Sequence, residues 1–454
     1  MVTLLENCRV SPPPNTSADK SLPLTFFDFI WVPFHPLGRV IFFDIPCSTN
    51  HFTQNIVLNL KTALSHALAH FSPFAGNLTK PTNTNSETEF QIRYVDGDSV
   101  SVTFAECTDD FNYICGNQVR DADILKPLVP RLPSGVALLQ ESGEKCFASP
   151  VLAIQVTVFP NHGISFGFTN SHTVSDGSSL FNFIHEWAKQ ATSKSDVAGS
   201  DFLSPYYDRS SLKDPLGLTT MFKGYFGGAD MAEHMEENIP DQSSGDKARA
   251  TFVLKQAEIE ALKSLVIEKK QNFPYVSSFT VVCAYVWTCM AKTRADVVGG
   301  MEQEPLNFGI AYDCRARLDP PLPASYFGNC IFSAVPVGRR DILAGEEGLL
   351  AAAELIGTAL YAKLNNKEGV LNNAHALLTT DFAGEGPGSE IGVINNTIDF
   401  GWGKPRKFEY VLEQFSISRG KDSKGDLELG FILPKNEVDV FSSIFARGLN
   451  LTLP

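Results

Sequence analysis

The chain has 454 residues, of which 43% are apolar and 11% aromatic, and its formal net charge is −14. This length exceeds what one hydrophobic core usually organises, so we expect two domains of similar size. The apolar content excludes a disordered chain. The acidic balance, without any basic block, argues against nucleic-acid binding.

The first residues and the cysteines favour a cytosolic protein without a metal. The start lacks the charged-then-apolar pattern of a signal peptide, and no apolar run is long enough to span a bilayer. The nine cysteines are scattered and never form a CxxC pair, which argues against a disulfide framework or a zinc knuckle. His66 and His70 have helical spacing, but no third ligand is nearby, so we expect no metal site.

Periodicity predicts the elements of the first half. Residues 53–71 read as a helix with Ile56, Leu60, Leu64, Leu68 and Phe71 on one face. Residues 150–159 read as a buried strand, residues 160–163 as a hairpin turn, and residues 164–169 as the returning strand. A helix should follow, with Phe181, Ile184 and Trp187 pointing inward.

The second half begins after a change in composition. Residues 192–249 are rich in Ser, Asp, Gly and Pro, so we divide the chain into an N-terminal domain (1–195), a connection (196–249) and a C-terminal domain (250–454). Beyond the connection we expect strands at 250–254 and 427–433 and helices at 256–269, 278–291 and 346–364. Strands and helices interleave in both halves, which predicts an α/β class with mixed sheets.

The segment with the clearest chemistry is His172-Thr-Val-Ser-Asp176-Gly177, an HxxxDG pattern. A histidine at the end of the 164–169 strand can present a ring nitrogen to a substrate and remove a proton near neutral pH. Asp176, one turn further, can fix the loop or the ring through hydrogen bonds. A Ser-His-Asp triad is the poorer interpretation because no GxSxG segment is present. A core histidine bonded to a local carbonyl remains the alternative.

Two further segments are distinctive. Asp399-Phe-Gly401-Trp402-Gly403 places two glycines around a tryptophan, which indicates a tight backbone with a structural role. If residues 307–317 form a strand, Asp313, Arg315 and Arg317 share one face and could pair with a carboxylate such as Asp176.

Together these segments resemble the BAHD family of plant acyl-CoA-dependent acyltransferases. HTVSDG and DFGWG match its two signature motifs in the expected order. Leu22-Pro-Leu-Thr-Phe-Phe-Asp28, Leu60-Lys-Thr-Ala-Leu-Ser65, Arg249-Ala-Thr-Phe-Val-Leu254 and Tyr326-Phe-Gly-Asn-Cys330 resemble the branch that acylates anthocyanins and other flavonoid glycosides.

The resemblance implies a monomer of two similar domains with a chloramphenicol-acetyltransferase-like core and an active-site channel between them. It also implies an acyltransferase that carries no permanently bound cofactor. Acyl-CoA would be the co-substrate and a phenolic glycoside the acceptor. His172 would take the proton of the acceptor hydroxyl as its oxygen attacks the thioester, without an acyl-enzyme.

The resemblance gives roles to further residues. Asp176 would point away from the channel and pair with Arg315 or Arg317, of which we favour Arg315. Asp399, Gly401, Trp402 and Gly403 would support the fold. Ser277, Ser278 and Thr280 resemble a family region near CoA, and exposed amides at a helix start can bind an anion. An ordinary helix cap is the equal alternative at that position.

One departure from the family pattern concerns the acyl donor. Malonyl-using members of the branch often carry an arginine eight residues after the motif histidine, where it can bind a buried carboxylate. This chain has Leu180 there and no lysine or arginine between His172 and Lys189. We therefore favour an uncharged acyl group such as hydroxycinnamoyl, with malonyl or acetyl as the alternative because an arginine could come from elsewhere.

Two other classes of function stay open. A non-catalytic relative would keep the fold as a binding module, although the presence of His172, Asp176 and Gly177 argues against it. A thioester hydrolase would use the same histidine to activate water and would release CoA without an acceptor.

Overall fold

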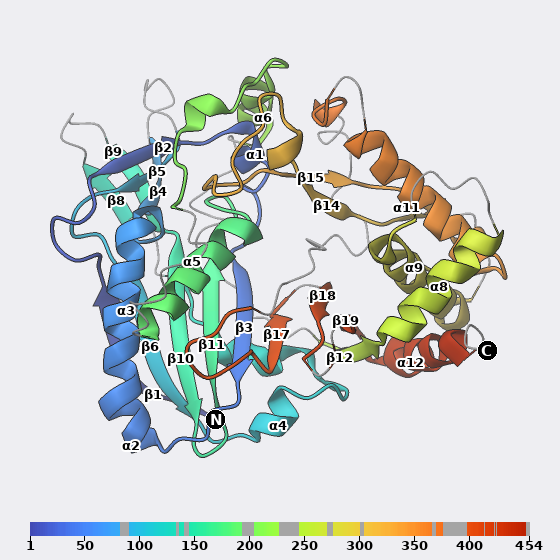
Figure 1. Cartoon of the computed structure of the whole chain (residues 1–454), viewed down its shortest axis with the longest axis horizontal. Coiled ribbons are helices and arrows are strands. Elements are labelled where there is room, and N and C mark those ends of the chain that lie inside the picture. The colour runs from blue at the N-terminus through green and yellow to red at the C-terminus, as the bar shows by residue number, and fades with distance from the viewer. Residues whose placement is uncertain are drawn as a thin grey trace.

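The computed structural model describes residues 1–81, 90–132, 136–139, 145–192, 204–226, 245–269, 276–299, 304–365, 369–375, 397–412, 414–421, 423 and 425–450. Strands and helices interleave along both halves, so the predicted α/β class is confirmed (Figure 1). Among these residues no helix is both long enough and apolar enough to cross a membrane.

The largest sheet has six strands in the order β1-β6-β10-β11-β3-β17. Strand β10 runs parallel to β6, and the other neighbours in the sheet are antiparallel, so the sheet is mixed as predicted. The strands are β1 Val2–Val10, β6 Val100–Cys107, β10 Leu152–Phe159, β11 Gly163–Asn170, β3 Leu37–Phe43 and β17 Lys407–Tyr410.

Strands β10 and β11 form the predicted hairpin and lie at the centre of this sheet. Every residue of both strands is buried, because the two faces of the sheet are covered by different elements. Helices α3 (Val57–His70) and α5 (Gly177–Ala191) pack together on one face, where Trp187 Nε1 donates a hydrogen bond to the Leu60 carbonyl at 3.0 Å. On the other face the 3₁₀ helix η3 (Ala122–Leu128) lies so close that a Cβ on Gly167 would come within 1.9 Å of the Leu128 carbonyl oxygen. Glycine is therefore required at residue 167.

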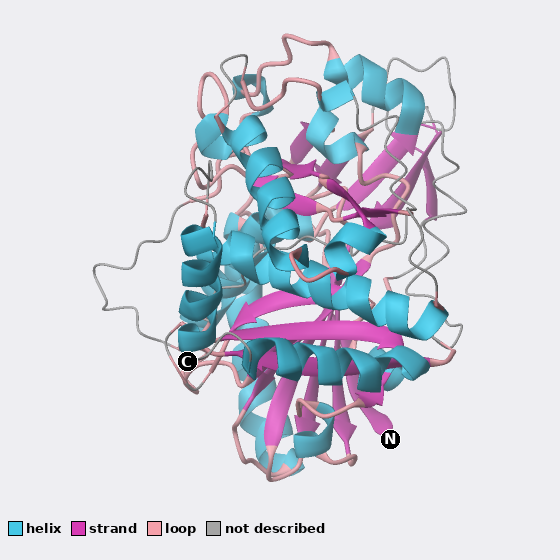
Figure 2. Ribbon diagram, turned by 90° about the vertical axis from the view of Figure 1, so that its right-hand side faces the viewer, coloured by secondary structure: helices cyan, strands magenta, loops and turns pink. Residues whose placement is uncertain are grey.

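The C-terminal half contains a four-stranded antiparallel sheet in the order β18-β19-β12-β7. Its strands are β18 Phe415–Arg419, β19 Leu427–Pro434, β12 Lys247–Leu254 and β7 Arg120–Asp121. The main helices of this half pack around α9, and Figure 2 shows helices lying across the strands. They are α8 Gln256–Lys269, α9 Ser278–Val298, α10 Arg340–Ala344, α11 Gly348–Leu364 and α12 Lys435–Asn450.

The remaining elements are short and complete the scaffold around these two sheets. A five-stranded sheet has the order β2-β5-β4-β9-β8, and two pairs, β13-β16 and β14-β15, stand alone. Their bounds are β2 Lys20–Pro23, β4 Asn77–Pro81, β5 Gln91–Tyr94, β8 Val136–Leu139, β9 Lys145–Pro150, β13 Pro305–Asn307, β14 Ile310–Asp313, β15 Ile331–Ala334 and β16 Val337–Arg339. The short helices are α1 Phe26–Phe29, α2 Thr49–His51, π-helical η1 Phe52–Ile56, η2 Ser72–Phe74, α4 Phe111–Ile114, η4 Arg209–Ser211, α6 Leu218–Phe226 and η5 Arg315–Arg317.

The two halves exchange strands. Strand β17 comes from the C-terminal half but pairs with β3 at the edge of the six-stranded sheet (Figure 1). Strand β7 comes from the N-terminal half and pairs with β12. The division into an N-terminal domain ending at residue 195 and a C-terminal domain starting at residue 250 remains a proposal. In space, each of the two large sheets contains residues from both of these parts of the chain.

The predicted connection is only partly described. Of residues 196–249, the structure describes 204–226 and 245–249. These include η4, α6 and the first residues of β12. The other residues of the predicted connection lie outside the described part of the chain.

Candidate active site

His172 lies in the turn that joins β11 to α5, two residues after the strand ends at Asn170. The predicted position at a strand end is confirmed. The turn is anchored because Ser171 N donates to the Val151 carbonyl at 3.0 Å, at the start of the neighbouring strand. The histidine side chain is buried.

Two of the contacts of His172 are described and hold it in place. Its ring stacks on Trp31, with ring centroids 3.7 Å apart and an interplanar angle of 19°. Its backbone carbonyl accepts a hydrogen bond from Asn329 Nδ2 at 2.8 Å. Trp31 Nε1 is buried and has no hydrogen-bond partner among the described residues, so an indole donor stands beside the ring face of the histidine.

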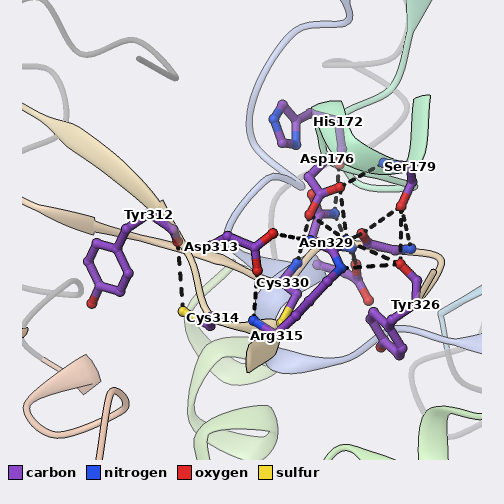
Figure 3. Close-up of polar contacts among 12 residues, drawn as sticks. His172, Asp176, Ser179, Tyr312, Asp313, Cys314, Arg315, Tyr326, Asn329 and Cys330 are labelled. Carbon is purple, nitrogen blue, oxygen red and sulfur yellow. Dashed lines mark hydrogen bonds and ion pairs between the residues drawn. The ribbon is translucent and has the colours of Figure 1, made fainter. Parts of the chain in front are cut away.

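Asp176 faces away from the imidazole. Figure 3 shows its carboxylate turned toward Arg315 and Cys330, while the ring of His172 points out of this network. Arg315 Nη2 lies 3.0 Å from Asp176 Oδ1 and 2.8 Å from Oδ2, and Cys330 N donates to Oδ2 at 3.1 Å. Asp176 also caps α5, accepting from Ser179 N at 3.1 Å. Asp176 therefore fixes the loop rather than the ring.

The buried pair joins the two halves of the chain. Arg315 is the arginine that the family resemblance favours; Arg317 instead donates to the Asp313 carbonyl at 2.9 Å. Burial alone would lower the pKa of Arg315, but the charges of Asp176 and Asp313 outweigh it and raise that pKa above its ordinary value. The guanidinium therefore stays charged.

The interpretation of residues 307–317 as one strand is wrong. Strand β14 ends at Asp313, and Arg315–Arg317 form the 3₁₀ helix η5. The strand stops because Asp313 turns its carboxylate back onto the chain: Oδ1 accepts from Arg315 N at 2.7 Å and Oδ2 from Arg315 Nη1 at 3.0 Å. Aspartate commonly ends strands in this way.

The DFGWG segment packs on the N-terminal half. Phe400 stacks on Phe166 of β11 with centroids 4.5 Å apart and meets Trp187 edge-on at 5.3 Å. Trp402 lies against Phe43 and Phe400. Asp399 Oδ1 closes the turn by accepting from Gly401 N at 2.7 Å and Gly403 N at 2.9 Å. This arrangement supports the fold and holds the segment just before β17.

Gly401→Ala is expected to lower the free energy of unfolding by about 1–2 kcal/mol, because its φ of 88° is unfavourable for a residue with a Cβ. We expect kcat to stay unchanged, since the contacts described for this turn are with Phe43, Phe166 and Trp187, in the core of the N-terminal half. Chemical denaturation and steady-state kinetics on the same preparation check this. A stable variant with reduced kcat would contradict a purely structural role.

The predicted CoA region is the N-terminus of α9. Ser277 caps the helix, with its Oγ accepting from Thr280 N at 3.0 Å. Thr280 is fully buried, and its hydroxyl lies 2.9 Å from Ser277 Oγ. Both hydroxyls are thus used within the cap, and Ser278 is half-buried. Contact between these three residues and CoA remains a proposal.

Leu180 belongs to the hydrophobic core. Its side chain is fully buried on the face of α5 that also carries Phe183, Ile184 and Trp187. Phe181, its neighbour, is partly buried and contacts Phe408 of β17 with centroids 5.6 Å apart. An arginine at residue 180 would have to place its charge in this apolar surrounding.

Three residues beside His172 had no role assigned from the sequence: Trp31, Asn329 and Asp28. Asp28 Oδ1 accepts from Asn329 Nδ2 at 2.9 Å, and Asn329 Nδ2 is the same group that contacts the His172 carbonyl. The only feature of the sequence that points to Asp28 and Asn329 is their position in two of the segments that resemble the family, residues 22–28 and 326–330. Arg209, bonded to Asp28 at 3.0 Å, gave no signal because it lies in the predicted connection.

Comparison with known proteins decides the family. A sequence profile described as the transferase family matches residues 1–447. The chain belongs to the BAHD acyltransferases. It is 38% identical to malonyl-coenzyme A:anthocyanin 3-O-glucoside-6''-O-malonyltransferase of Dahlia pinnata, over 99% of this chain and 97% of the relative. It is 32% identical to coumaroyl-CoA:anthocyanidin 3-O-glucoside-6''-O-coumaroyltransferase 2 of Arabidopsis thaliana, over 98% of this chain and 97% of the relative.

Solved structures confirm the BAHD fold. Vinorine synthase superposes with a TM-score of 0.66 at 18% identity, covering 97% of this chain and 96% of that one. The F. sporotrichioides TRI101 structure, complexed with coenzyme A and T-2, superposes with a TM-score of 0.61 at 13% identity, covering 93% of this chain and 97% of that one. As a BAHD member the chain is an acyltransferase, and HTVSDG lies in it where a strand turns into a helix.

Proposed function

We propose that this BAHD enzyme transfers an acyl group from acyl-CoA to a sugar hydroxyl of an anthocyanin, flavonoid or other phenolic glycoside, with His172 as general base. The proposal rests on the surroundings of His172. Its side chain is buried and stacks on Trp31, and Asp176 does not orient the ring because its carboxylate is paired with Arg315. The names of the relatives, which act on anthocyanin or phenolic glucosides, support the acceptor class.

The mechanism needs a base for the acceptor hydroxyl and no nucleophile of the enzyme. As the hydroxyl oxygen attacks the thioester carbonyl, its proton moves to the imidazole. The tetrahedral intermediate then expels CoA thiolate, which takes up the proton from the imidazolium as the ester forms, so the neutral imidazole is restored. A positioned base contributes roughly 10²–10⁴-fold in rate, and holding the two substrates together supplies much of the remainder.

For the donor we propose a hydroxycinnamoyl group. Residue 180 is a core leucine, and no lysine or arginine follows His172 until Lys189 in the last turn of α5, so the part of this helix next to His172 offers no cationic side chain for a malonyl carboxylate. Malonyl is the second candidate, because relatives at 37–38% identity are malonyltransferases. The proposal further includes a monomer acting in the cytosol.

His172→Ala is expected to lower acyl transfer by about 10²–10⁴-fold. The measurement is CoA release from coumaroyl-, caffeoyl-, malonyl- and acetyl-CoA, each with and without cyanidin 3-O-glucoside. The matched control is His162→Ala, an exposed histidine in the hairpin turn at the opposite end of β11.

The pattern of release separates the alternatives. Release that requires the glucoside and disappears in His172→Ala supports the transferase, and the fastest donor tests the argument from Leu180. Release without any acceptor indicates a hydrolase. Full transfer by a folded His172→Ala protein rules out the proposed base.

A further inference from the structure

Asp28 lies at the centre of a buried polar network beside His172. Its carboxylate is fully buried and accepts hydrogen bonds on both oxygens. Oδ1 accepts from Asn329 N at 3.2 Å and from Asn329 Nδ2 at 2.9 Å. Oδ2 accepts from Thr25 N at 2.9 Å, from Thr25 Oγ1 at 2.8 Å and from Arg209 Nη1 at 3.0 Å.

One branch of the network leads to the backbone of His172. Asn329 Nδ2 donates to Asp28 and, at 2.8 Å, to the His172 carbonyl. An amide nitrogen has two hydrogens, so both bonds can form at once. The side chain of Asn329 therefore links Asp28 directly to the residue that carries the base.

A second branch leads to the ring of His172. Asp28 closes the capping box of α1, and Trp31 N donates to the Asp28 carbonyl at 3.1 Å in the next turn. The position of α1 thus sets the position of the Trp31 ring, which stacks on the imidazole. Both of these contacts of His172 lead back to Asp28: the first to its carboxylate, and the second to its cap on α1 and its backbone carbonyl.

Arg209 supplies the counter-charge from the connecting segment. It is buried, and its Nη1 also lies 3.0 Å from the hydroxyl of Tyr326. Burial alone would lower the pKa of Arg209, but the charge of Asp28 outweighs it and raises that pKa. The loop is shaped around this side chain: Gly328 has a φ of 133°, and a Cβ there would come within 2.6 Å of Arg209 Nη1.

We propose that Asp28 is a positioning residue for acyl transfer, which orients His172 through Asn329 and Trp31 and is held in place by Arg209. This inference rests on the proposed role of His172 as the base. A buried ion pair can also serve stability alone. The experiment must therefore include a measurement that a loss of stability alone would not alter.

The first variant is Asn329→Ala, which removes the link to the His172 carbonyl and leaves the Asp28–Arg209 pair in place. The second is Asp28→Asn. With coumaroyl-CoA and cyanidin 3-O-glucoside, we expect kcat to fall by about 10²-fold, since misplacing a reacting group by ~1 Å costs that much. The KM for acyl-CoA should change little. The control is Asp44→Asn, a carboxylate paired with Arg406 at 3.0 Å on the surface.

The readout that does not depend on activity is the fluorescence of Trp31. A protonated imidazole quenches the fluorescence of an indole that it contacts. The difference in emission between a protein and its Trp31→Phe variant is the emission of Trp31. The change of this difference in a pH titration reports on the contact with His172. We expect the amplitude of this titration to fall in Asn329→Ala and Asp28→Asn and to stay unchanged in Asp44→Asn.

The outcomes are distinct. Reduced kcat with a reduced titration amplitude in folded Asn329→Ala supports the proposal, and this variant decides it if Asp28→Asn does not fold. Wild-type kcat and amplitude in folded Asn329→Ala would overturn it. Full activity of His172→Ala would instead refute the proposed base, while the titration would still show whether Asp28 positions the ring.

Discussion

Asp176→Ala is expected to lower the free energy of unfolding by about 3–5 kcal/mol, because it leaves the charge of Arg315 buried without its main partner. The carboxylate is bonded to Arg315 through both oxygens. It also accepts from the backbone of Cys330 and Ser179. Loss of the cap on α5 alone accounts for about 1 kcal/mol of this effect. Urea denaturation of the purified variant measures it.

The matched control is Asp313→Ala, the other carboxylate that contacts Arg315. Its side chain is 48% exposed, so its ion pair with Arg315 is screened by water and its loss should cost about 0–1 kcal/mol. The lost hydrogen bond from Arg315 N should add about 1 kcal/mol, which still leaves the effect well below that of Asp176→Ala. A double-mutant cycle of Asp176→Ala with Arg315→Ala should show strong coupling, since removing both partners leaves no unpaired buried charge.

This prediction separates a structural from a catalytic role for the motif aspartate. An Asp176→Ala protein as stable as the wild type, but with a changed pH–rate profile, would mean that Asp176 acts on the imidazole and would contradict the geometry. A destabilised Asp176→Ala protein whose folded fraction keeps nearly the wild-type pH–rate profile would agree with the geometry.

Elements dominated by local periodicity could be predicted from the sequence. Residues 256–269 form α8 as predicted, and the hairpin of β10 and β11 lies within a residue or two of its predicted bounds. The predicted apolar face of the 53–71 helix is buried, although its first residues form the π-helical turn η1. In each case the side chains of one short segment decide the structure.

Elements that depend on distant partners could not be predicted. Strand β17 has only four residues, Lys-Phe-Glu-Tyr, and its pairing with β3 crosses most of the chain. In the site, HTVSDG identified His172 and Asp176. Asp28 and Asn329 lie 301 positions apart, so no local pattern could show that they form a hydrogen bond. The role of Arg209 could not be predicted because this residue lies in a segment whose composition indicates a connection between domains.

Glu409→Gln is expected to destabilise the protein by about 3–5 kcal/mol, comparable to Asp176→Ala. Glu409 lies on β17 and is surrounded by three buried cations, which together with it we call the Glu409 cluster: Arg120, Arg249 and Lys407. The glutamate lies 2.8 Å from Arg120 and 3.2 Å from Lys407. Because these residues come from β7, β12 and β17, the cluster joins the exchanged strands.

The cluster also predicts a dependence on pH. Burial alone would raise the pKa of Glu409, but the three cations outweigh burial and lower it from 4.5 to about 2. A carboxylate with a lowered pKa in the folded state stabilises the protein fully above its unfolded pKa. That contribution, about 3 kcal/mol, is lost as the pH falls from 4.5 toward 2.

Other carboxylates also titrate in this range, so the difference between wild type and variant is the quantity to measure. Denaturation at several pH values between 7 and 2.5 gives the free energy of unfolding of the wild type, of Glu409→Gln and of the control Glu260→Gln, an exposed glutamate on α8. The gap between wild type and Glu409→Gln should be largest near pH 7 and narrow below pH 4.5, because the wild type alone loses the charge of Glu409. Glu260→Gln should follow the wild type throughout. A gap that stays constant with pH would mean that Glu409 contributes through packing and not through its charge, and the exchanged strands would then be held together without the ionic cluster.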